Sequence, residues 1–357
     1  RNNFVQFGLG TGVFEELPKV AVILPVYNVE QYLKECLESI VCQTYKNFIV
    51  FAVDDGSTDR SGKILDEFGE KDSRFCINHK LNGGVSSARN LALEMMEAFP
   101  CAFDLVCFVD GDDIIKPHFI RNYVDHFQNN SVDYVVCGWN SFDKVGIVDH
   151  GRERHLDVIT SNSGAYRHLF LIGEWKGRLP VSFAYFLSNK CFSARVLYGL
   201  RFDESLSRGE DLDFVIRSLL NVKKALIGSA INYMYRLRQS SLSHGSEQPI
   251  VDEMYVYVLL LRKIAKMPPD VRTFIEQRAH ELWWGSIRRT IEAKVYGEYK
   301  KQIYEAYKIL LSSCSVMTLP NKFKRRFLCY LAGEKFLNLY FRGRVKSESV
   351  ISTNLFE

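Results

Sequence analysis

Residues 19–28 have the sequence KVAVILPVYN, an apolar and β-branched run that meets a proline only near its end. Such a run is typical of a strand buried on both faces of a sheet. Apolar residues then recur at helical spacing over residues 29–41, and a second apolar run, FIVFAV, occupies residues 48–53. The sequence therefore predicts a strand, a helix and a second strand, which is the repeating unit of a parallel sheet.

The same alternation continues to about residue 120 with short connections. It predicts an α/β fold of Rossmann-like type, in which helices cover both faces of a mostly parallel sheet. Ligands of such sheets bind at the carboxyl ends of the strands. We expect further strands at 74–78, 105–109 and 132–139, and helices after residue 59 and at 85–99, 165–172 and 209–220.

The composition is that of a globular protein. Hydrophobic types make up 47% of the 357 residues and charged types 25%, and the formal net charge is +4. This balance excludes an unstructured chain and does not favour a partner made of nucleic acid. Nine cysteines without a CxxC pair disfavour structural zinc and favour a reducing compartment, and no apolar run is long enough to span a membrane. We therefore expect a cytoplasmic protein.

The character of the sequence changes near residue 245, where the strand-like runs stop. Residues 251–266, 269–295 and 299–311 have helical patterns, and Pro268 and Pro269 separate the first two. We predict an N-terminal tail at 1–19, an α/β domain at 20–245 and a helical C-terminal region at 246–357.

The end of the helical region is basic. Residues 322–346 contain eight Lys or Arg and one Glu, a net charge of 8 − 1 = +7, interspersed with Phe and Leu. One hypothesis is a helix that lies on an anionic membrane, which would place the protein at the inner face of the cytoplasmic membrane. The alternative is a packed helical subdomain with a solvated basic face.

Acidic residues follow two of the predicted buried strands. They are Asp54 and Asp55 after the run FIVFAV, and Asp110, Asp112 and Asp113 after the run LVCFV. Carboxylates at this spacing repel one another unless a cation relieves them, and oxygen ligands suit Mg²⁺ or Mn²⁺. The alternative is that these residues only form turns and cap helices.

A glycine pair and an arginine lie at the start of the helix predicted at 85–99. Gly83 and Gly84 would expose backbone N–H groups, which suit an anionic oxygen. Arg89 would reach the same anion or form a surface ion pair. Neither feature alone distinguishes the two interpretations.

Several of these segments together resemble a known family. The run at 20–61, NGGVSSARNLAL at 82–93, FVDGDD at 108–113 and the segment 188–214, which ends in GEDLDF, are similar to family 2 glycosyltransferases with the GT-A fold. The bacterial enzymes that build capsule, lipopolysaccharide and exopolysaccharide are the most similar members. The resemblance covers residues 20–245 and does not extend to the helical region.

The resemblance implies a site for a nucleoside-diphosphate sugar, with a uridine diphosphate sugar as the expected donor. Asp54 would accept the uracil N3–H, and Asp112 would bind a Mn²⁺ or Mg²⁺ ion that bridges the two phosphates. The other donor-binding residues that it implies are Pro25, Val26 and Tyr27 at the nucleobase, Lys80, Gly83 and Arg89 over the base and diphosphate, and Asp110, Gly111 and Asp113 at the ribose, sugar or acceptor.

The resemblance also assigns the chemistry. Asp211, with Glu210 beside it, matches the catalytic base, and His244 matches a metal-binding or phosphate-facing histidine. Arg236 and Arg238 are candidates for contact with the leaving diphosphate. The implied reaction is transfer with inversion to a hydroxyl of a glycan or lipid-linked acceptor, and an oligomer of identical chains is left open.

Two other functions compete with this interpretation. A phosphatase that forms an aspartyl-phosphate also has an Asp-x-Asp pair after an apolar strand, as at Asp110 and Asp112, but it leaves Asp54 and Arg89 unexplained. A catalytically silent nucleotide-sugar-binding scaffold would not need Asp112 or Asp211. A processive membrane synthase is disfavoured, because the chain contains no QxxRW sequence.

Overall fold

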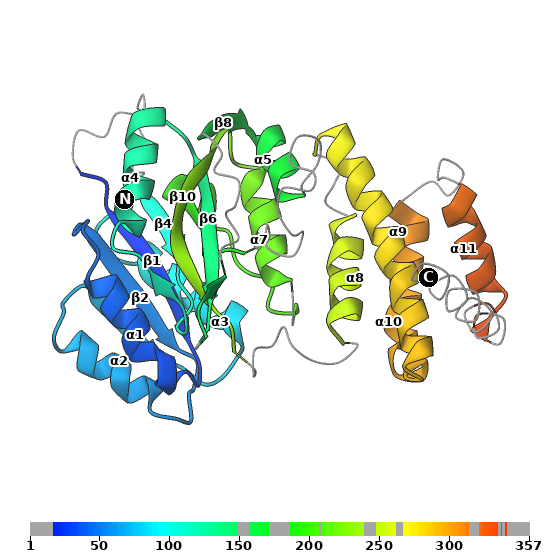
Figure 1. The fold of residues 1–357 in the computed structure, drawn as a ribbon, viewed down its shortest axis with the longest axis horizontal. Coiled ribbons are helices and arrows are strands. Elements are labelled where there is room, and N and C mark those ends of the chain that lie inside the picture. Colours follow the sequence, from blue (N-terminus) through cyan, green and yellow to red (C-terminus); the bar gives the residue numbers. More distant parts are fainter. Residues whose placement is uncertain are drawn as a thin grey trace, which may run out of the picture. The chain divides into compact units, whose positions relative to one another are not determined.

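A computed structural model describes residues 17–143, 145–148, 157–170, 186–206, 209–238, 248–261, 267–313, 321–334, 337 and 340. The chain divides into two compact units, Arg1–Ser241 and Leu242–Glu357 (Figure 1). The boundary predicted at residue 245 and most of the predicted tail lie outside the described residues.

The first unit is built on a sheet whose centre is parallel (Figure 1). Strand β1 (Val20–Val26) is buried along its whole length and pairs in parallel with β2 (Phe48–Asp54) and β4 (Leu105–Phe108). Strand β3 (Phe75–His79) continues the parallel sheet beside β2. The predicted strand–helix–strand unit and the α/β class are confirmed.

Antiparallel pairings extend the sheet on the other side of β4. Strand β9 (Lys190–Ser193) pairs antiparallel with β4 and with β6 (Tyr134–Phe142), and β10 (Lys224–Arg236) is parallel to β6. The order of the described strands is β3-β2-β1-β4-β9-β6-β10-β5. Three short strands complete it: β5 (Ile114–Ile115) and β8 (Val158–Ser161) on β10, and β7 (Ile147–Val148) on β6.

Helices cover both faces of the sheet, as predicted. Helices α1 (Glu30–Val41) and α4 (Phe119–Asn130) share one apolar core with alternate residues of β1 and β2. Helices α3 (Val85–Glu97) and α7 (Glu210–Leu219) cover the opposite face, where Phe108 of β4 meets Phe214 with ring centroids 5.8 Å apart. The remaining described helices of this unit are α2 (Ser61–Gly69), α5 (Asn162–Leu169) and α6 (Ala194–Leu197).

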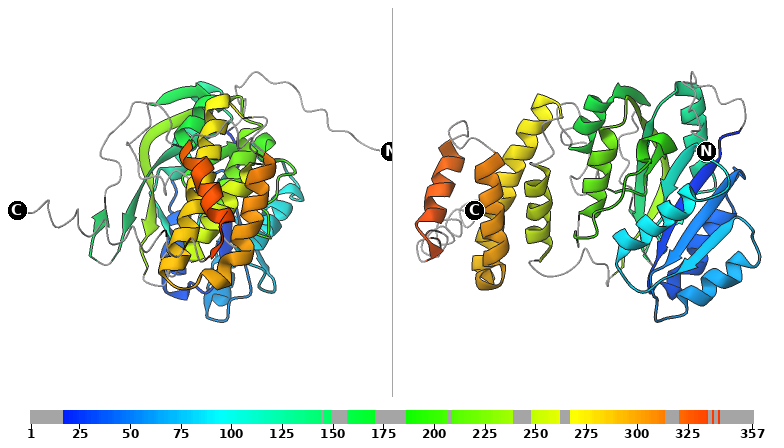
Figure 2. Two further views of the ribbon diagram at one scale, coloured as in Figure 1. Left: turned by 90° about the vertical axis from the view of Figure 1, so that its right-hand side faces the viewer. Right: turned by 180° about the vertical axis from the view of Figure 1, so that it is seen from behind.

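The second unit is helical in its described parts. It contains α8 (Gln248–Leu260), α9 (Pro269–Glu292), α10 (Tyr296–Ser313) and α11 (Asn321–Leu331) (Figures 1 and 2). Trp283 of α9 stacks on Tyr307 of α10 and on Phe327 of α11, with centroids 5.8 Å and 5.2 Å apart. Among the helices that the structure describes, none has both the length and the apolar character of a membrane span.

Candidate active site

The candidate site lies at the carboxyl edge of the parallel strands. The segment 110–113 follows β4 and leads directly into β5, which pairs with β10. The segment is therefore held between two strands. Gly111 passes so close to β1 that a Cβ atom there would lie 3.3 Å from the Pro25 carbonyl oxygen, which explains why a glycine suits this position.

Arg89 joins acidic residues from distant parts of the chain. Its side chain is only 4% exposed, and it donates hydrogen bonds to Asp110 Oδ1 at 3.0 Å and to Asp211 Oδ1 at 2.6 Å. Glu210, at the start of α7, lies 3.3 Å from the same guanidinium. We call these four residues the Arg89 cluster. It is a buried ion-pair network, so the surface ion pair considered above is wrong.

Burial and mutual repulsion govern protonation in the Arg89 cluster. Burial raises the pKa of Asp211, and Arg89 opposes that shift. Burial and the charge of Asp211 raise the pKa of Glu210 to about 7. Burial tends to lower the pKa of Arg89, but the three carboxylates outweigh it, so the guanidinium stays charged. Carboxylates with raised pKa values are suited to accept a proton near neutral pH.

The turn at residues 186–190 supports the Arg89 cluster. Ser188 Oγ donates to Asp110 Oδ2 at 2.8 Å, and the backbone N–H of Leu187 donates to Asp211. Tyr233 of β10 also contacts the aspartate segment, since the N–H of Asp110 lies 3.3 Å from its hydroxyl oxygen. The sequence did not predict Ser188 or Tyr233 at the site, although Ser188 lies in the segment that resembles the family.

The last two acids of the segment differ in their surroundings. Asp113 is completely buried, and its oxygens accept hydrogen bonds from the Tyr233 hydroxyl at 2.6 Å and the Arg236 N–H at 2.8 Å. Its predicted contact with the sugar or acceptor needs correction, because both oxygens are held inside the fold. Asp112 has a 14% exposed side chain and forms an ion pair with Arg238 at 2.6 Å.

Two arginines at the end of β10 surround Asp112. Arg236 donates to the Asp112 carbonyl oxygen at 2.7 Å and to Glu35 at 2.6 Å. Arg238 lies over the ring of Tyr32 at 5.5 Å. The buried Nε atoms of Arg238 and of Arg89 find no acceptor among the residues that the structure describes, so each could donate to an anionic ligand.

Asp54 at the end of β2 and Asp55 after it are held by the chain itself. Asp54 Oδ1 accepts the N–H of Ser57, and Asp54 Oδ2 lies 3.0 Å from His79 Nδ1. Asp54 is 6% exposed. It therefore lies at the predicted edge of the sheet, but both of its oxygens already have partners in this structure.

Asp55 organises the glycine turn that precedes α3. Its carboxylate accepts hydrogen bonds from Lys80 Nζ at 2.7 Å and from the N–H groups of Gly83 at 3.0 Å and Gly84 at 2.7 Å. The expectation that these N–H groups are open to a ligand therefore needs correction, because the anion that they bind belongs to the chain.

The residues predicted at the nucleobase lie at the end of β1. Pro25 and Val26 are buried within the strand, whereas Tyr27 is 49% exposed. The Val26 carbonyl accepts the Asp55 N–H at 2.8 Å, which joins this end of β1 to the acid pair.

The predicted metal ligand His244 lies outside the described residues. The described residues contain no cluster of three ligands that could hold a metal ion.

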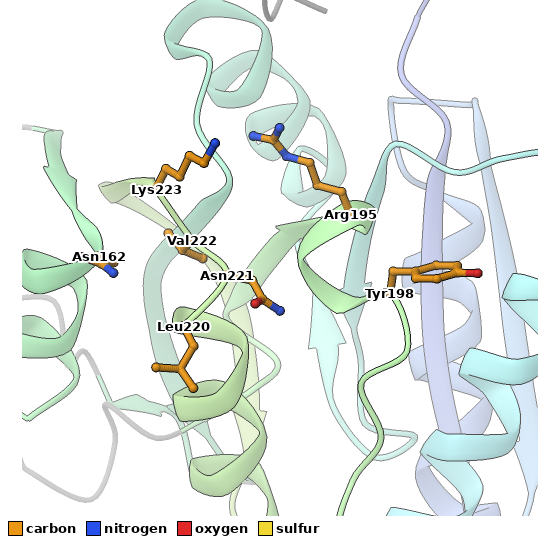
Figure 3. A pocket seen from close by; sticks show the side chains of 7 residues that line it. All are labelled: Asn162, Arg195, Tyr198, Leu220, Asn221, Val222 and Lys223. Atoms are coloured by element: carbon orange, nitrogen blue, oxygen red, sulfur yellow. The ribbon is translucent and has the colours of Figure 1, made fainter. Parts of the chain in front are cut away.

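A hollow of about 660 Å³ has none of the Arg89 cluster among its lining residues, which Figure 3 shows. It lies where α7 leads into β10, and the acids lie at the far end of that strand. Asp211 of the Arg89 cluster stands at the start of α7 and Leu220 follows its end, so nine residues at ~1.5 Å each place about 14 Å of helix between the cluster and the hollow. Its lining residues are Asn162, Arg195, Tyr198, Leu220, Asn221, Val222 and Lys223.

Comparison with known proteins identifies the class of domain that holds this site. Residues 21–188 match the model of Glycosyl transferase family 2. The chain therefore carries a family 2 glycosyltransferase domain, and the resemblance seen in its sequence is confirmed.

A relative of known family agrees with this assignment. Glycosyltransferase GlyA of Streptococcus pneumoniae is 34% identical over 228 residues, which are 63% of this chain and 31% of GlyA. The chain thus spans less than a third of that relative.

Solved structures share the fold. S. aureus TarS 1-349 in complex with UDP-GlcNAc matches with a TM-score of 0.63 at 20% identity. The match covers 84% of this chain and 82% of the TarS chain. The mannosyltransferase PcManGT from Pyrobaculum calidifontis, in complex with GDP-Man and Mn2+, has a TM-score of 0.53 at 17% identity, over 96% and 88% of the two chains. The predicted GT-A fold is confirmed.

Proposed function

We propose that the protein transfers a sugar from a nucleoside-diphosphate sugar, with UDP as the preferred nucleotide, to a hydroxyl of a glycan or lipid-linked acceptor. We further propose that the transfer inverts the anomeric configuration and serves the synthesis of bacterial surface polysaccharide. The observation that carries the proposal is the Arg89 cluster. It brings Asp110, from the segment expected to bind the donor, within one guanidinium of Asp211, the expected base.

The proposed reaction is a single displacement at the anomeric carbon. Asp211 accepts the proton of the acceptor hydroxyl, the new bond forms between that oxygen and the anomeric carbon, and the bond from this carbon to the diphosphate oxygen breaks. General-base catalysis of this kind contributes roughly 10²–10⁴ in rate. Arg89 and Arg238 supply fixed positive charge, and their Nε atoms, which lack an acceptor among the described residues, are suited to the diphosphate.

We propose Asp112 as the protein's carboxylate ligand for Mn²⁺ or Mg²⁺, with His244 as a second ligand. The donor set fits in part: Asp112 offers a hard, partly exposed oxygen, but that oxygen is paired with Arg238 in this structure. When bound, the ion would supply positive charge to the leaving diphosphate. A bound diphosphate would have to complete its coordination. The Mn2+ in the complex of PcManGT with GDP-Man is consistent with this choice.

A donor screen tests the proposal directly. TarS with UDP-GlcNAc supports a uridine nucleotide, whereas PcManGT with GDP-Man supports guanosine. We expect a UDP-sugar with Mn²⁺ to raise the melting temperature most, since a ligand that binds only the folded state stabilises it. Donor turnover and the anomeric configuration of the product are then measured by NMR. No stabilisation and no turnover with UDP-, GDP- or CDP-sugars would contradict the proposal, and so would phosphatase activity without glycosyl transfer.

We also propose that the second unit contacts an anionic membrane, where a lipid-linked acceptor would be found. The structure divides the apolar residues of α11: Phe323 and Phe327 are buried in the helical core, whereas Leu328 and Leu331 are each 66% exposed. Arg325 is exposed on the same helix. Exposed leucines beside arginine and lysine are typical of helices that lie on anionic lipid.

Sedimentation with vesicles tests this contact. The variant Leu328→Glu with Leu331→Glu should lose most binding to vesicles of phosphatidylglycerol and phosphatidylcholine at low salt. The matched control is Ile147→Glu in the first unit, which changes an aliphatic side chain that is 65% exposed. This variant should bind the vesicles as the wild type does. Equal binding by all three proteins, or equal binding to pure phosphatidylcholine, would refute the contact.

A further inference from the structure

The turn at residues 186–190 contacts acids from both sides of the Arg89 cluster. Ser188 holds Asp110 of the aspartate segment, and the Leu187 N–H holds Asp211 of α7. The turn is closed by the N–H of Lys190, which donates to the Leu187 carbonyl at 3.0 Å. Its geometry therefore fixes two carboxylates that are distant in sequence.

Lys190 is a charged side chain that the proposed reaction does not use directly. It is completely buried, at 0% exposure. Its Nζ donates to Asn189 Oδ1 at 2.8 Å and to the Phe186 carbonyl. The Asn189 amide is itself oriented by a 2.8 Å hydrogen bond to the Cys137 carbonyl. Burying an ammonium group is costly, so a purely apolar filler would serve packing better.

The Arg89 cluster has more acidic groups than basic ones. Three carboxylates, those of Asp110, Glu210 and Asp211, share the single guanidinium of Arg89. Like charges at this spacing favour protonation of at least one carboxylate. The charge of Lys190 acts on Asp211 and favours its ionised form.

We infer that Lys190 is a positioning residue that keeps Asp211 ionised and correctly placed as the base, acting through the turn without touching substrate. This inference rests on the proposed function, in which Asp211 accepts the acceptor proton. It assigns to Lys190 a role that the resemblance to the family did not imply.

The pH range of the two groups agrees with this role. Burial lowers the pKa of Lys190 to about 7, so its charge is present mainly below that pH. Burial raises the pKa of Asp211 and so favours the protonated base, and the charge of Lys190 opposes this shift. The other charged groups that act on Asp211 are Arg89 of α3, Asp110 of the aspartate segment and Glu210 of α7. The positive charge of Lys190 therefore opposes protonation of Asp211 at pH values below about 7.

The test uses two variants of Lys190 that both remove the charge. Lys190→Gln keeps a donor for Asn189 and Phe186, whereas Lys190→Met keeps only the bulk. In both variants, loss of the positive charge should move the acid limb of the pH profile of kcat up by about one pH unit. On that limb, one pH unit is about a tenfold change in the ionised fraction of the base. For Lys190→Gln, activity should fall up to about tenfold on the acid limb and less than about twofold on the alkaline plateau, with an unchanged donor KM. Lys190→Met also loses the hydrogen bonds to Asn189 and Phe186, so its plateau should fall as well.

Lys224→Met is the matched control. Lys224 Nζ donates to the Asn130 carbonyl at the other end of β10, so this variant loses a lysine hydrogen bond far from the cluster and should keep the wild-type profile. Uniform loss at every pH in Lys190→Gln, or a wild-type profile for that variant, would overturn the inference. If Lys190→Met does not fold, Lys190→Gln decides alone. Failure of the proposed function is distinguishable, since wild-type enzyme would then transfer no sugar at any pH.

Discussion

The two units of the chain bury different kinds of polar side chain. The first unit buries charged side chains, including Arg89, Asp113 and Lys190, next to its apolar core. In the described part of the second unit, the buried polar residues are His280, Ser286 and Thr290. Thr290 donates to the Ser286 carbonyl of its own helix, and His280 Nδ1 lies 2.8 Å from the Glu276 carbonyl.

This difference shows where stability and chemistry are separated. Aromatic rings such as Trp283 contribute by removing apolar surface from water, which requires no partner of opposite charge. A buried carboxylate costs free energy unless it is paired, and such costs are concentrated at functional sites. Substitutions of the buried charged residues in the first unit should therefore act on turnover and in some cases also on stability, whereas substitutions in the core of the second unit should act on folding alone.

Asp211→Asn should give the largest effect on turnover. Asparagine keeps the shape of the side chain but cannot accept the proton, so kcat should fall by roughly 10²–10⁴. Donor affinity should change little, which isothermal titration with UDP-sugar and Mn²⁺ would measure. Asp213→Asn, two residues along the same helix, breaks the 2.7 Å ion pair with Arg217 and provides the control. A comparable loss of kcat in both variants would contradict the assignment of Asp211.

Arg89→Met should affect both turnover and stability. Removing the guanidinium leaves three carboxylates without their shared partner, and breaking a buried pair from one side costs about 3–5 kcal/mol. Urea unfolding would measure the free energy, and donor titration would measure the loss of diphosphate contact. Arg201→Met is the control, because Arg201 is 30% exposed and its pair with Glu97 should be worth less than about 1 kcal/mol. Equal stability of the two variants would argue against a buried network.

Trp283→Ala should affect folding of the second unit and leave donor binding unchanged. Trp283 is 1% exposed and packs against four other aromatic side chains, so truncation should cost about 3–5 kcal/mol. Hydrogen exchange of peptides from residues 269–313 should accelerate, while peptides from residues 20–60 keep their protection. Tyr304→Ala, at a 47% exposed position, should change little. Loss of UDP-sugar binding in Trp283→Ala would break the proposed separation of roles.

The sequence predicts the regular parts of the fold well, because strong patterns decide them. The apolar run at 19–28 becomes β1, and the helical patterns at 269–295 and 299–311 become α9 and α10. The sequence pattern does not indicate β9, which has only four residues, or β10, whose register shifts between Ile227 and Ile231. A short strand and an irregular one both lack the alternation on which prediction depends.

The candidate site is predictable in its members but not in its contacts. Arg89 and Asp211 are 122 residues apart, and only the topology of the sheet brings them to one hydrogen bond. A lysine at the start of a strand, such as Lys190, is expected to be solvated, so nothing in the local sequence indicates its burial. Asp113 shows the opposite case. The resemblance to the family implies that its carboxylate faces the sugar or acceptor, but the structure buries it.

His79 should give the smallest effect, on the pH dependence of stability in the first unit. Hydrogen bonds to Asp54 and Asp66 raise the pKa of His79 above its ordinary value. A raised folded-state pKa adds stability below the unfolded pKa near 6.5, and this stability is lost as pH rises through the folded value. Since the side chain is 45% exposed, we expect less than about 1 kcal/mol.

The variant His79→Asn cannot titrate and isolates this contribution. Hydrogen exchange of peptides covering β2 and β3 should be slower in the wild type than in the variant at pH 5.5, and the difference should shrink at pH 9. The opposite trend, with a larger difference at pH 9, would mean that His79 is held neutral. Asp54 would then lack a cationic partner in the free enzyme. Its carboxylate would be more readily available to the nucleobase of the donor than this structure indicates.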